Sequence, residues 1–244
     1  QRLSFPWPWL QSWLWCRADR VTANTTGVLD ALQRRNPGLA SRMKLLPNPL
    51  VLHSAQEDAI GWRDTSEVPA FIAVCRLVPQ KGIDLLVEAY AALSSAIHGQ
   101  WRLLIIGDGP ERAALEQRTS DLQLAERIHF LGFQPDPSRY FHDAVVFVLP
   151  SRFEGMPNAL LEAMAAGLAV IVTDASPGPL EMVEPGVSGL VVPSDDPAAL
   201  AKAMDALASD PERCRRMGAA ARTRIGALDW PQLEPLWRSI LALS

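Results

Sequence analysis

Two basic residues share a short segment that joins an apolar, strand-like run to a helical pattern. Arg76 and Lys81 lie in residues 75–82, with the sequence CRLVPQKG. A guanidinium binds phosphate oxygens in a bidentate way, whereas an ammonium supplies a movable point charge. The unpaired amides of a helix N-terminus also attract anions. The segment therefore predicts a site for an anionic group such as a diphosphate; two solvated surface charges are the alternative.

A second segment carries two carboxylates, eight residues apart. Glu154 and Glu162 lie in residues 151–164, SRFEGMPNALLEAM, and the second falls in a helix that we expect to start near Pro157. A carboxylate accepts hydrogen bonds from two adjacent hydroxyls, as on a ribose or a hexose. Gly155 lets a ligand approach the backbone closely. Taken alone, Glu162 fits a solvated helix position, but its apolar neighbours predict burial, which requires a partner.

Regular alternation of strand-length apolar runs and amphipathic helices predicts the elements that position these residues. The pattern from residue 69 onward is typical of parallel βαβ units. We therefore expect an α/β fold, a Rossmann-like parallel sheet with helices on both faces, whose strands all end at one ligand-binding edge. One helical stripe contains Ile83, Leu86, Val87 and Tyr90. The six expected strands lie near residues 71–75, 102–106, 127–130, 145–149, 169–173 and 189–192.

The beginning of the chain has a different pattern and predicts the end of another α/β domain. We expect a short amphipathic helix from Pro8, a strand over residues 20–25, a helix capped by Thr26, and a strand over residues 44–46. The predicted organisation is the C-terminal remnant of one Rossmann domain (1–48), a linker (49–68), a second, Rossmann-like domain (69–225) and a C-terminal helix (226–244). The chain begins with Gln1, so a fragment is one interpretation.

Composition limits the classes of partner. The 244 residues carry a net charge of −4, but residues 1–50 hold seven Lys or Arg against two Asp, so the remainder is strongly acidic. An acidic body argues against nucleic acid. No apolar run reaches the length of a membrane span and no leader is recognisable, so we expect a cytoplasmic protein. Four tryptophans in the basic first segment predict peripheral contact with the inner face of the plasma membrane; burial against a missing domain body is the alternative.

Other chemistries find less support in the sequence. Residues 107–110, GDGP, resemble a dinucleotide loop, but Arg112 takes the place of the third glycine, which argues against a nicotinamide enzyme. The four histidines have no recognisable Ser or Cys nucleophile beside them. The three cysteines are widely spaced and odd in number, which suits a reducing compartment.

Several motifs in order and register resemble one enzyme family, the retaining GT-B glycosyltransferases of family 4 (group 1), over about residues 20–225. The residues that carry the resemblance are Arg76-Leu77, Lys81-Gly82, Gly107-Asp108-Gly109-Pro110, Phe130-Leu131-Gly132-Phe133, Ser151, Glu154-Gly155 and Glu162-Ala163-Met164. Pro157-Asn158-Ala159-Leu160 with Gly178-Pro179 is most similar to bacterial transferases of capsule, exopolysaccharide and lipopolysaccharide O-antigen assembly. The resemblance implies the C-terminal donor domain of a GT-B fold.

The resemblance also implies roles for individual residues. Arg76 and Lys81 would bind the donor diphosphate and neutralise the charge that develops on it, and Glu154 would contact the transferring sugar; these three form the implied catalytic set. Glu162 would bind the ribose and Phe133 would flank the base. Gly107 and the amides near Gly155 and Met156 complete the nucleotide-sugar set. Pro157 lacks an amide hydrogen that much of the family uses, so Asn158 is expected to compensate.

The resulting hypothesis is the donor-binding half of an enzyme. It would transfer a hexose or N-acetylhexosamine from a UDP-sugar to a lipid-linked saccharide with retention of configuration, without a required metal. Family members also carry an N-terminal domain that binds the acceptor, and residues 1–48 match only its end. A nucleotide-sugar-binding module that needs a separate acceptor-binding subunit is therefore an alternative, and an epimerase-type hydrolase of the same fold is another.

Overall fold

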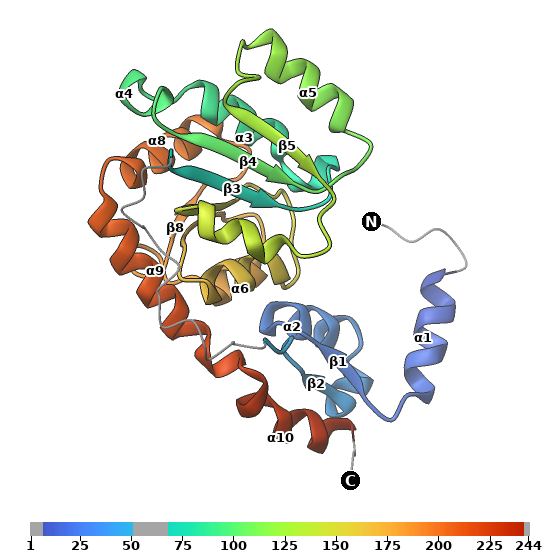
Figure 1. The fold of residues 1–244 in the computed structure, drawn as a ribbon. Coiled ribbons are helices and arrows are strands. Elements are labelled where there is room, and N and C mark those ends of the chain that lie inside the picture. The colour runs from blue at the N-terminus through green and yellow to red at the C-terminus, as the bar shows by residue number, and fades with distance from the viewer. Residues whose placement is uncertain (1–6, 51–67, 242–244) are drawn as a thin grey trace.

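The computed structural model describes residues 7–50 and 68–241, which form two parallel sheets (Figure 1). The larger sheet has six strands in the order β5-β4-β3-β6-β7-β8, and every neighbouring pair is parallel. Its strands are β3 (Ala70–Val74), β4 (Arg102–Ile106), β5 (Ile128–Gly132), β6 (Val146–Leu149), β7 (Ala169–Thr173) and β8 (Leu190–Val192). The chain runs outward from β3 to β5, then returns to β6 and runs outward on the other side. The strand order therefore reverses between β3 and β6, which is where ligands bind in sheets of this type.

Helices cover both faces of this sheet. Alternate strand residues point to opposite faces, so Phe71 and Leu103 join one buried cluster and Ile72 and Leu104 join another. The first cluster packs under α3 (Ile83–Ala91), α5 (Arg112–Asp121) and α8 (Pro197–Ala208), and the second packs under α6 (Asn158–Ala165) and the end of α9 (Pro211–Ile225). The predicted fold, a parallel sheet with helices on both faces, is confirmed.

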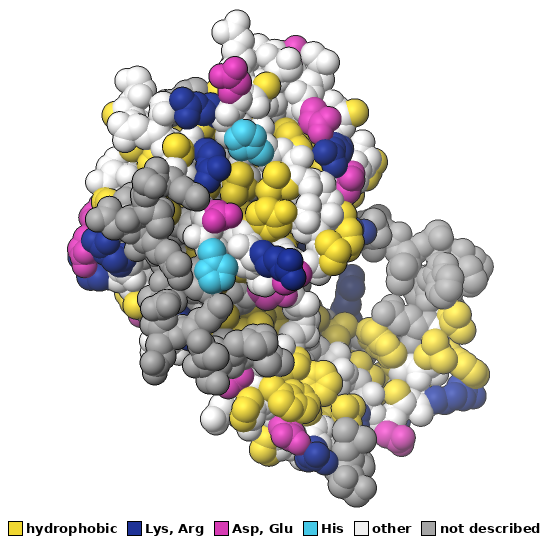
Figure 2. All heavy atoms as spheres, viewed as in Figure 1, with side chains coloured by type: hydrophobic (Ala, Val, Ile, Leu, Met, Phe, Trp, Pro, Cys, Tyr) yellow, Lys and Arg dark blue, Asp and Glu magenta, His cyan; other side chains and the backbone are white. Residues whose placement is uncertain are grey.

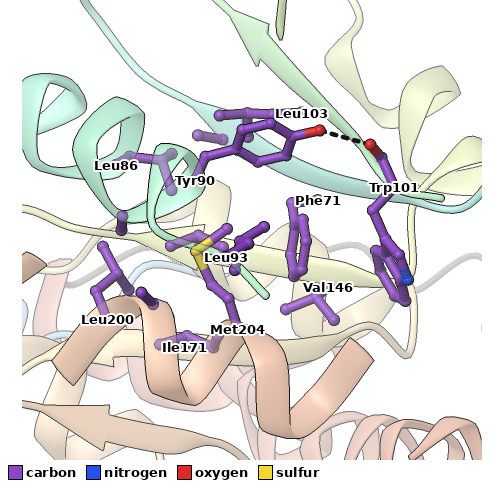
Figure 3. Close-up of a cluster of buried hydrophobic side chains, with 14 of the residues drawn as sticks. Phe71, Leu86, Tyr90, Leu93, Trp101, Leu103, Val146, Ile171, Leu200 and Met204 are labelled. Atoms are coloured by element: carbon purple, nitrogen blue, oxygen red, sulfur yellow. Dashed lines mark hydrogen bonds between the residues drawn. The ribbon is translucent and has the colours of Figure 1, made fainter. Parts of the chain in front are cut away.

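The first core cluster shows how the predicted helical stripe is buried. Ile83, Leu86, Val87 and Tyr90 of α3 are all fully buried. The Tyr90 hydroxyl donates a 2.5 Å hydrogen bond to the backbone carbonyl of Trp101, so its polar end is satisfied within the core (Figure 3). The centre of the Trp101 ring lies 4.6 Å from the centre of the Phe71 ring. This packing fixes α3 against β3 and β4.

The remaining helices and turns lie between the strands or follow the last one. They are α4 (Ser95–His98), α7 (Pro177–Met182), α10 (Trp230–Leu241) and the 3-10 turns η2 (Pro79–Lys81), η3 (Pro137–Asp143) and η4 (Gly226–Leu228). Strand positions agree with the sequence prediction to within about two residues. The largest difference is β5, which continues to Gly132, because that residue pairs with Ile106 beyond a register irregularity in β4 and its carbonyl accepts a hydrogen bond from Gly107.

The N-terminal segment forms the smaller sheet. Strands β1 (Val21–Ala23) and β2 (Met43–Leu45) pair in parallel, joined by α2 (Thr26–Arg35) and the turn η1 (Pro37–Arg42). The prediction that Thr26 caps α2 is wrong. Thr25 is the cap: its backbone is extended and its hydroxyl accepts a hydrogen bond from the Val28 amide, whereas the Thr26 amide donates to Glu181.

The two sheets are connected by specific contacts. The carboxylate of Glu181, in α7, accepts hydrogen bonds from the amides of Thr26 at 2.8 Å and Gly27 at 2.7 Å. Helix α10 extends from the larger unit to the smaller one (Figure 1), where the indole of Trp237 donates to the Pro47 carbonyl. Most of the predicted linker, residues 51–67, lies outside the described residues, so the predicted domain boundaries stay predictions.

A helix, α1 (Trp7–Arg17), lies where one was predicted, one residue earlier than Pro8, but its apolar residues are spread around the helix, so the predicted amphipathic character is wrong. Its Leu10, Trp13 and Leu14 side chains are exposed, and the Arg17 guanidinium lies 3.7 Å from the centre of the Trp13 ring. Figure 2 shows this group of hydrophobic side chains at the N-terminal end of the molecule. Within residues 7–50 and 68–241, no helix is long and apolar enough to cross a membrane. The expected membrane contact stays a prediction.

Candidate functional site

Lys81 and Glu154 meet at the point where the strand order reverses. Lys81 ends the turn η2 after β3, and Glu154 lies in the loop after β6. The Lys81 ammonium is 2.6 Å from a carboxylate oxygen of Glu154, and the two side chains are only 18% and 7% exposed. The structure therefore joins two predicted site residues, 73 positions apart, in one largely buried ion pair.

Glu154 is fixed by its surroundings as well as by Lys81. The Ser151 hydroxyl donates a 2.7 Å hydrogen bond to the carboxylate, and the Glu154 amide donates to the Ser176 hydroxyl at 2.8 Å. Both serines are buried. A charged side chain held by two fixed partners retains little conformational freedom, so its position is set before any ligand arrives.

Close backbone approaches hold the two loops in place. Gly82 adopts a left-handed conformation (φ 66°), and a Cβ atom there would lie 2.1 Å from the Pro150 carbonyl oxygen. At Gly178, in the first turn of α7, a Cβ would lie 1.5 Å from the Gly155 carbonyl oxygen. Any larger residue at these two positions would displace the loops that carry Lys81 and Glu154.

Arg76 is an exposed cation on the same loop as Lys81. Across the described parts of the chain it has no ion pair or side-chain hydrogen bond. Its loop is bound to the one after β4: the Leu77 amide donates to the Asp108 carbonyl, and a Cβ at Gly107 would lie 1.8 Å from the Cys75 carbonyl oxygen. Gly107 thus permits the close contact between these loops. Burial raises the pKa of Cys75 to about 12, so its thiol stays protonated.

Glu162 differs from the prediction, because its side chain is exposed rather than buried. It projects from the second turn of α6, where the apolar neighbours Ala163 and Met164 fill the core side. Its side chain makes no hydrogen bond or ion pair within residues 7–50 and 68–241. Partial desolvation raises the pKa of Glu162, and the negative charge of Asp136 raises it further. Asp136 caps the turn η3, so the charge that acts on Glu162 comes from the segment that follows β5.

Met156 and Asn158 contact the N-terminal segment. The Asn48 side chain donates a 2.7 Å hydrogen bond to the Asn158 side-chain oxygen, and its amide donates to the Met156 sulfur at 3.4 Å. Met156 is buried. The side-chain oxygen of Asn158 already accepts this hydrogen bond. Compensation for the missing Pro157 amide therefore depends on the side-chain NH₂ group and the backbone N–H of Asn158. Sequence reasoning missed Asn48, because its partner is 110 residues away.

Phe133 follows β5 and is 73% exposed. Arg112 connects the loop of Phe133 to the loop of residues 107–110. The Arg112 side chain donates to the Asp108 carboxylate at 3.0 Å and to the Phe130 carbonyl at 3.3 Å. The sequence did not reveal that Arg112 braces these loops, because its partners are set by the fold. Nor did it reveal a role for Arg152, which makes the most extensive side-chain contacts in this region.

The predicted site residues share one edge of the larger sheet, because each lies in a segment that follows the C-terminal end of one of its parallel strands, whereas Asn48 follows β2 of the smaller sheet. The structure brings together Lys81, Glu154 and the Gly155–Gly178 contact and leaves Arg76, Phe133 and Glu162 exposed around them. Among the described residues, no group of three His, Cys, Asp or Glu side chains could hold a metal ion. The expectation that no metal is required stays a prediction.

Comparison with known proteins places this arrangement in a family. Residues 57–224 match the family described as glycosyl transferases group 1. The chain is 37% identical over 186 residues, 75% of its length, to an exopolysaccharide phosphotransferase of Streptomyces coelicolor, but spans only 19% of that protein. It is 29% identical to a Campylobacter jejuni N-acetylgalactosamine-N,N'-diacetylbacillosaminyl-diphospho-undecaprenol 4-alpha-N-acetylgalactosaminyltransferase, and the match covers 90% of this chain and 59% of that one.

A solved structure shows the same fold at low sequence identity. HepE of Anabaena, in complex with UDP and glucose, superposes with a TM-score of 0.80 at 22% identity, over 92% of this chain and 63% of that one. The parallel sheet, the family match over most of the chain and the structural neighbour agree with one another. The chain therefore belongs to the group 1 glycosyltransferase family and has a GT-B type of fold.

Proposed function

We propose that this chain binds the donor of a retaining glycosyltransferase, a UDP-linked hexose or N-acetylhexosamine. The observation that carries the proposal is the Lys81–Glu154 ion pair, which lies largely buried where the strand order reverses. A cation and an acid fixed at this point match a ligand that combines a diphosphate with a hydroxyl-rich sugar. The structural neighbour HepE, seen with UDP and glucose, supports the same ligand class.

The proposed division of roles follows from charge and exposure. Arg76 and Lys81 bind the diphosphate and neutralise the charge that develops as the bond from sugar to phosphate breaks. Glu154 accepts hydrogen bonds from hydroxyls of the transferring sugar, and Glu162 accepts them from the ribose. Phe133 covers the base. Lys81 can bind phosphate without leaving Glu154, because an ammonium has three donors.

The acceptor and the cellular setting are proposed from relatives. The Campylobacter transferase acts on a saccharide linked to undecaprenol diphosphate, and a Rhizobium meliloti relative is a lipopolysaccharide core biosynthesis glycosyltransferase. We infer a lipid-linked saccharide acceptor, cell-surface polysaccharide assembly, a cytoplasmic location at the inner face of the membrane, and catalysis without a required metal. Because the chain spans about three fifths of the Campylobacter relative, these statements concern the whole protein.

Calorimetric titration of the purified chain with UDP, GDP and a panel of UDP-sugars tests the proposal. We expect UDP and at least one UDP-sugar to bind more tightly than GDP, with no change when a chelator is present. The double variant Arg76→Ala, Lys81→Ala should lose this binding. Equal binding by the double variant and the unaltered chain would overturn the assignment of the site.

A second candidate is a nucleotide-sugar-binding module that has no activity without a separate acceptor-binding subunit. The observation that favours it is that the described N-terminal residues, 7–50, contribute a sheet of two short strands beside the six-stranded sheet. Donor hydrolysis and sugar transfer should be measured for this chain and for the complete gene product. Transfer by the complete gene product alone favours the single enzyme, whereas donor binding without transfer in both preparations favours the module.

A further inference from the structure

Arg152 connects three loops at the ligand-binding edge of the larger sheet. Its guanidinium donates to both carboxylate oxygens of Asp84, at 2.8 and 2.7 Å, and to Asp195 at 2.7 Å. A further bond from the guanidinium reaches the Pro79 carbonyl at 2.7 Å. Arg152 follows β6, Pro79 and Asp84 follow β3, and Asp195 follows β8. Bidentate pairing fixes the guanidinium geometrically as well as electrostatically.

The backbone next to Arg152 reinforces this connection. The Arg152 amide donates a 2.8 Å hydrogen bond to the Gln80 carbonyl, and the Gln80 side chain donates to the Phe153 carbonyl at 3.0 Å. These bonds lie directly before the two residues of the Lys81–Glu154 ion pair, since Lys81 follows Gln80 and Glu154 follows Phe153. The Lys81–Glu154 contact is therefore framed by bonds that Arg152 and Gln80 make one or two residues away.

Asp195 shows that the third loop is held in an unusual conformation. Its φ of 55° is in the left-handed region, which residues other than glycine adopt at some energetic cost. Asp is among the residues that tolerate this region best, and here it directs the carboxylate at Arg152. A residue keeps an unfavourable backbone conformation only when the surrounding structure holds it there, so the Asp195–Arg152 contact is a built-in part of this loop.

The charge balance indicates that Arg152 does not itself bind the diphosphate. It faces two carboxylates, Asp84 and Asp195, so its positive charge is already more than matched. Arg76, by contrast, has no anionic partner in the described parts of the chain. Asp84 lies in the first turn of α3, close to the end of the loop that would receive an anion. Its hydrogen bonds to Arg152 lower its pKa, so it stays ionised.

We propose that Arg152 is a positioning residue, which holds the loop after β3 against the loop after β6 so that Lys81 and Glu154 can act on one donor molecule. The inference rests on the proposed donor site and adds a residue to it. Arg152 acts through Asp84 and the η2 turn and does not contact the ligand. Asp84 is thus part of the same brace, although its charge alone opposes the binding of an anion.

Two variants, Asp84→Asn and Arg152→Lys, distinguish a positioning role for Arg152 from an effect of its charge alone. Arg152→Gln removes the brace and one positive charge, so both ideas predict weaker UDP binding. Asp84→Asn removes a negative charge near the anion site, and charge alone predicts equal or tighter binding, whereas loss of positioning predicts weaker binding. Arg152→Lys keeps the charge but cannot span both oxygens of Asp84 together with Asp195. Arg215→Gln, which breaks an exposed pair with Glu212 on α9, serves as the matched control.

The experiment measures the affinity of each purified variant for UDP and for uridine by competition titration. We expect Arg152→Gln, Asp84→Asn and Arg152→Lys to weaken UDP binding about tenfold or more, since each removes a charge-assisted bond, with little change for uridine. Arg215→Gln should match the unaltered chain. Unchanged or tighter UDP binding by Asp84→Asn, or equal losses for UDP and uridine, would overturn the positioning role.

Amide hydrogen exchange without ligand distinguishes failure of this inference from failure of the proposed function. We expect faster exchange at residues 79–84 in Arg152→Gln than in Arg215→Gln. Exchange is measured at a temperature below the thermal unfolding midpoints of both variants, so the comparison concerns the folded state. If the unaltered chain binds no nucleotide, the proposed function fails, and the brace is judged by exchange alone. Equal exchange in the two variants overturns the inference whatever the binding result.

Discussion

Two pairs of predicted site residues, each a cation and an acid, have opposite surroundings. Lys81 and Glu154, the inner pair, are bonded to each other and largely buried. Arg76 and Glu162, the outer pair, are exposed and make no side-chain bond within the described residues. The inner pair contributes to the folded structure and to the proposed site, whereas the outer pair has no structural task that the contacts reveal. The difference predicts that substitutions in the two pairs will affect stability and binding in different proportions.

The largest expected effect comes from breaking the inner pair. Lys81→Ala leaves the Glu154 carboxylate buried with the Ser151 hydroxyl as its remaining side-chain partner. We expect a loss of about 3 kcal/mol in the free energy of unfolding together with a loss of UDP binding of tenfold or more. Denaturant unfolding and calorimetric titration measure the two quantities. Lys202→Ala, on the exposed face of α8, is the control. A stable variant that still binds UDP would remove the distinction between the pairs.

The next effect tests whether the inner pair depends on its backbone support. Gly178→Ala places a Cβ only 1.5 Å from the Gly155 carbonyl oxygen, so the loop that carries Glu154 must move. We expect a loss of roughly 2–3 kcal/mol in unfolding free energy and weaker UDP binding. Gly99→Ala, where a Cβ meets nothing within 4 Å, is the matched substitution and should change neither quantity. Equal stability of the two variants would show that the close approach is not required.

A third effect isolates the outer cation. Arg76→Ala should weaken UDP binding about tenfold, because a charge-assisted bond to phosphate is lost. The free energy of unfolding should change by less than about 0.5 kcal/mol, since the side chain is exposed and unpaired in the described structure. Arg216→Ala, on α9, controls for the loss of a surface cation. Destabilisation as large as that of Lys81→Ala would contradict the separation of inner and outer pairs.

The smallest expected effect concerns the outer acid and its response to pH. Desolvation raises the pKa of Glu162, so the carboxylate becomes protonated at a higher pH than an ordinary glutamate. If the ionised form binds the ribose, UDP affinity should fall about fivefold as pH decreases through that raised pKa. Glu162→Gln should weaken binding by a similar factor and remove this part of the pH dependence. Titrations at several pH values check both statements.

The same raised pKa has a consequence for folding with a defined sign. A group whose pKa is higher in the folded state adds stability below its unfolded pKa and loses that contribution as pH rises through its folded pKa. Glu162→Gln should therefore be slightly more stable than the unaltered chain at neutral pH and equal to it in acid. Greater stability of the unaltered chain at neutral pH would indicate that Glu162 has a partner after all.

Local sequence signals predicted most of the fold and only part of the site. The stripe from Ile83 to Tyr90 and the apolar strands were readable, because burial imposes a regular spacing on neighbouring residues. The cap of α2 was misplaced by one residue, since Thr25 and Thr26 are both suitable and the choice depends on distant Glu181. The exposure of Glu162 was missed, because apolar neighbours along a helix do not reveal which way one side chain faces.

Contacts between distant loops could not be predicted from one sequence. Arg152 and Asp84 are 68 residues apart, and neither stands out by composition or spacing. A single arginine in a loop fits a solvated charge as well as a brace, and only the assembled sheet places three loops around it. The residues named by family resemblance lie at the expected edge, but their support was visible only in three dimensions.

The hydrogen bonds that Asn48 donates and Glu181 accepts bear on how the polypeptide could be divided. Because residues on both sides of 51–67 are hydrogen-bonded to each other directly, a peptide of residues 1–50 should associate with a separately produced piece of residues 68–244. Such reassembly would be governed by the concentration of the pieces instead of by the covalent connection. It would also make the N-terminal segment a removable part of the surface that surrounds Met156.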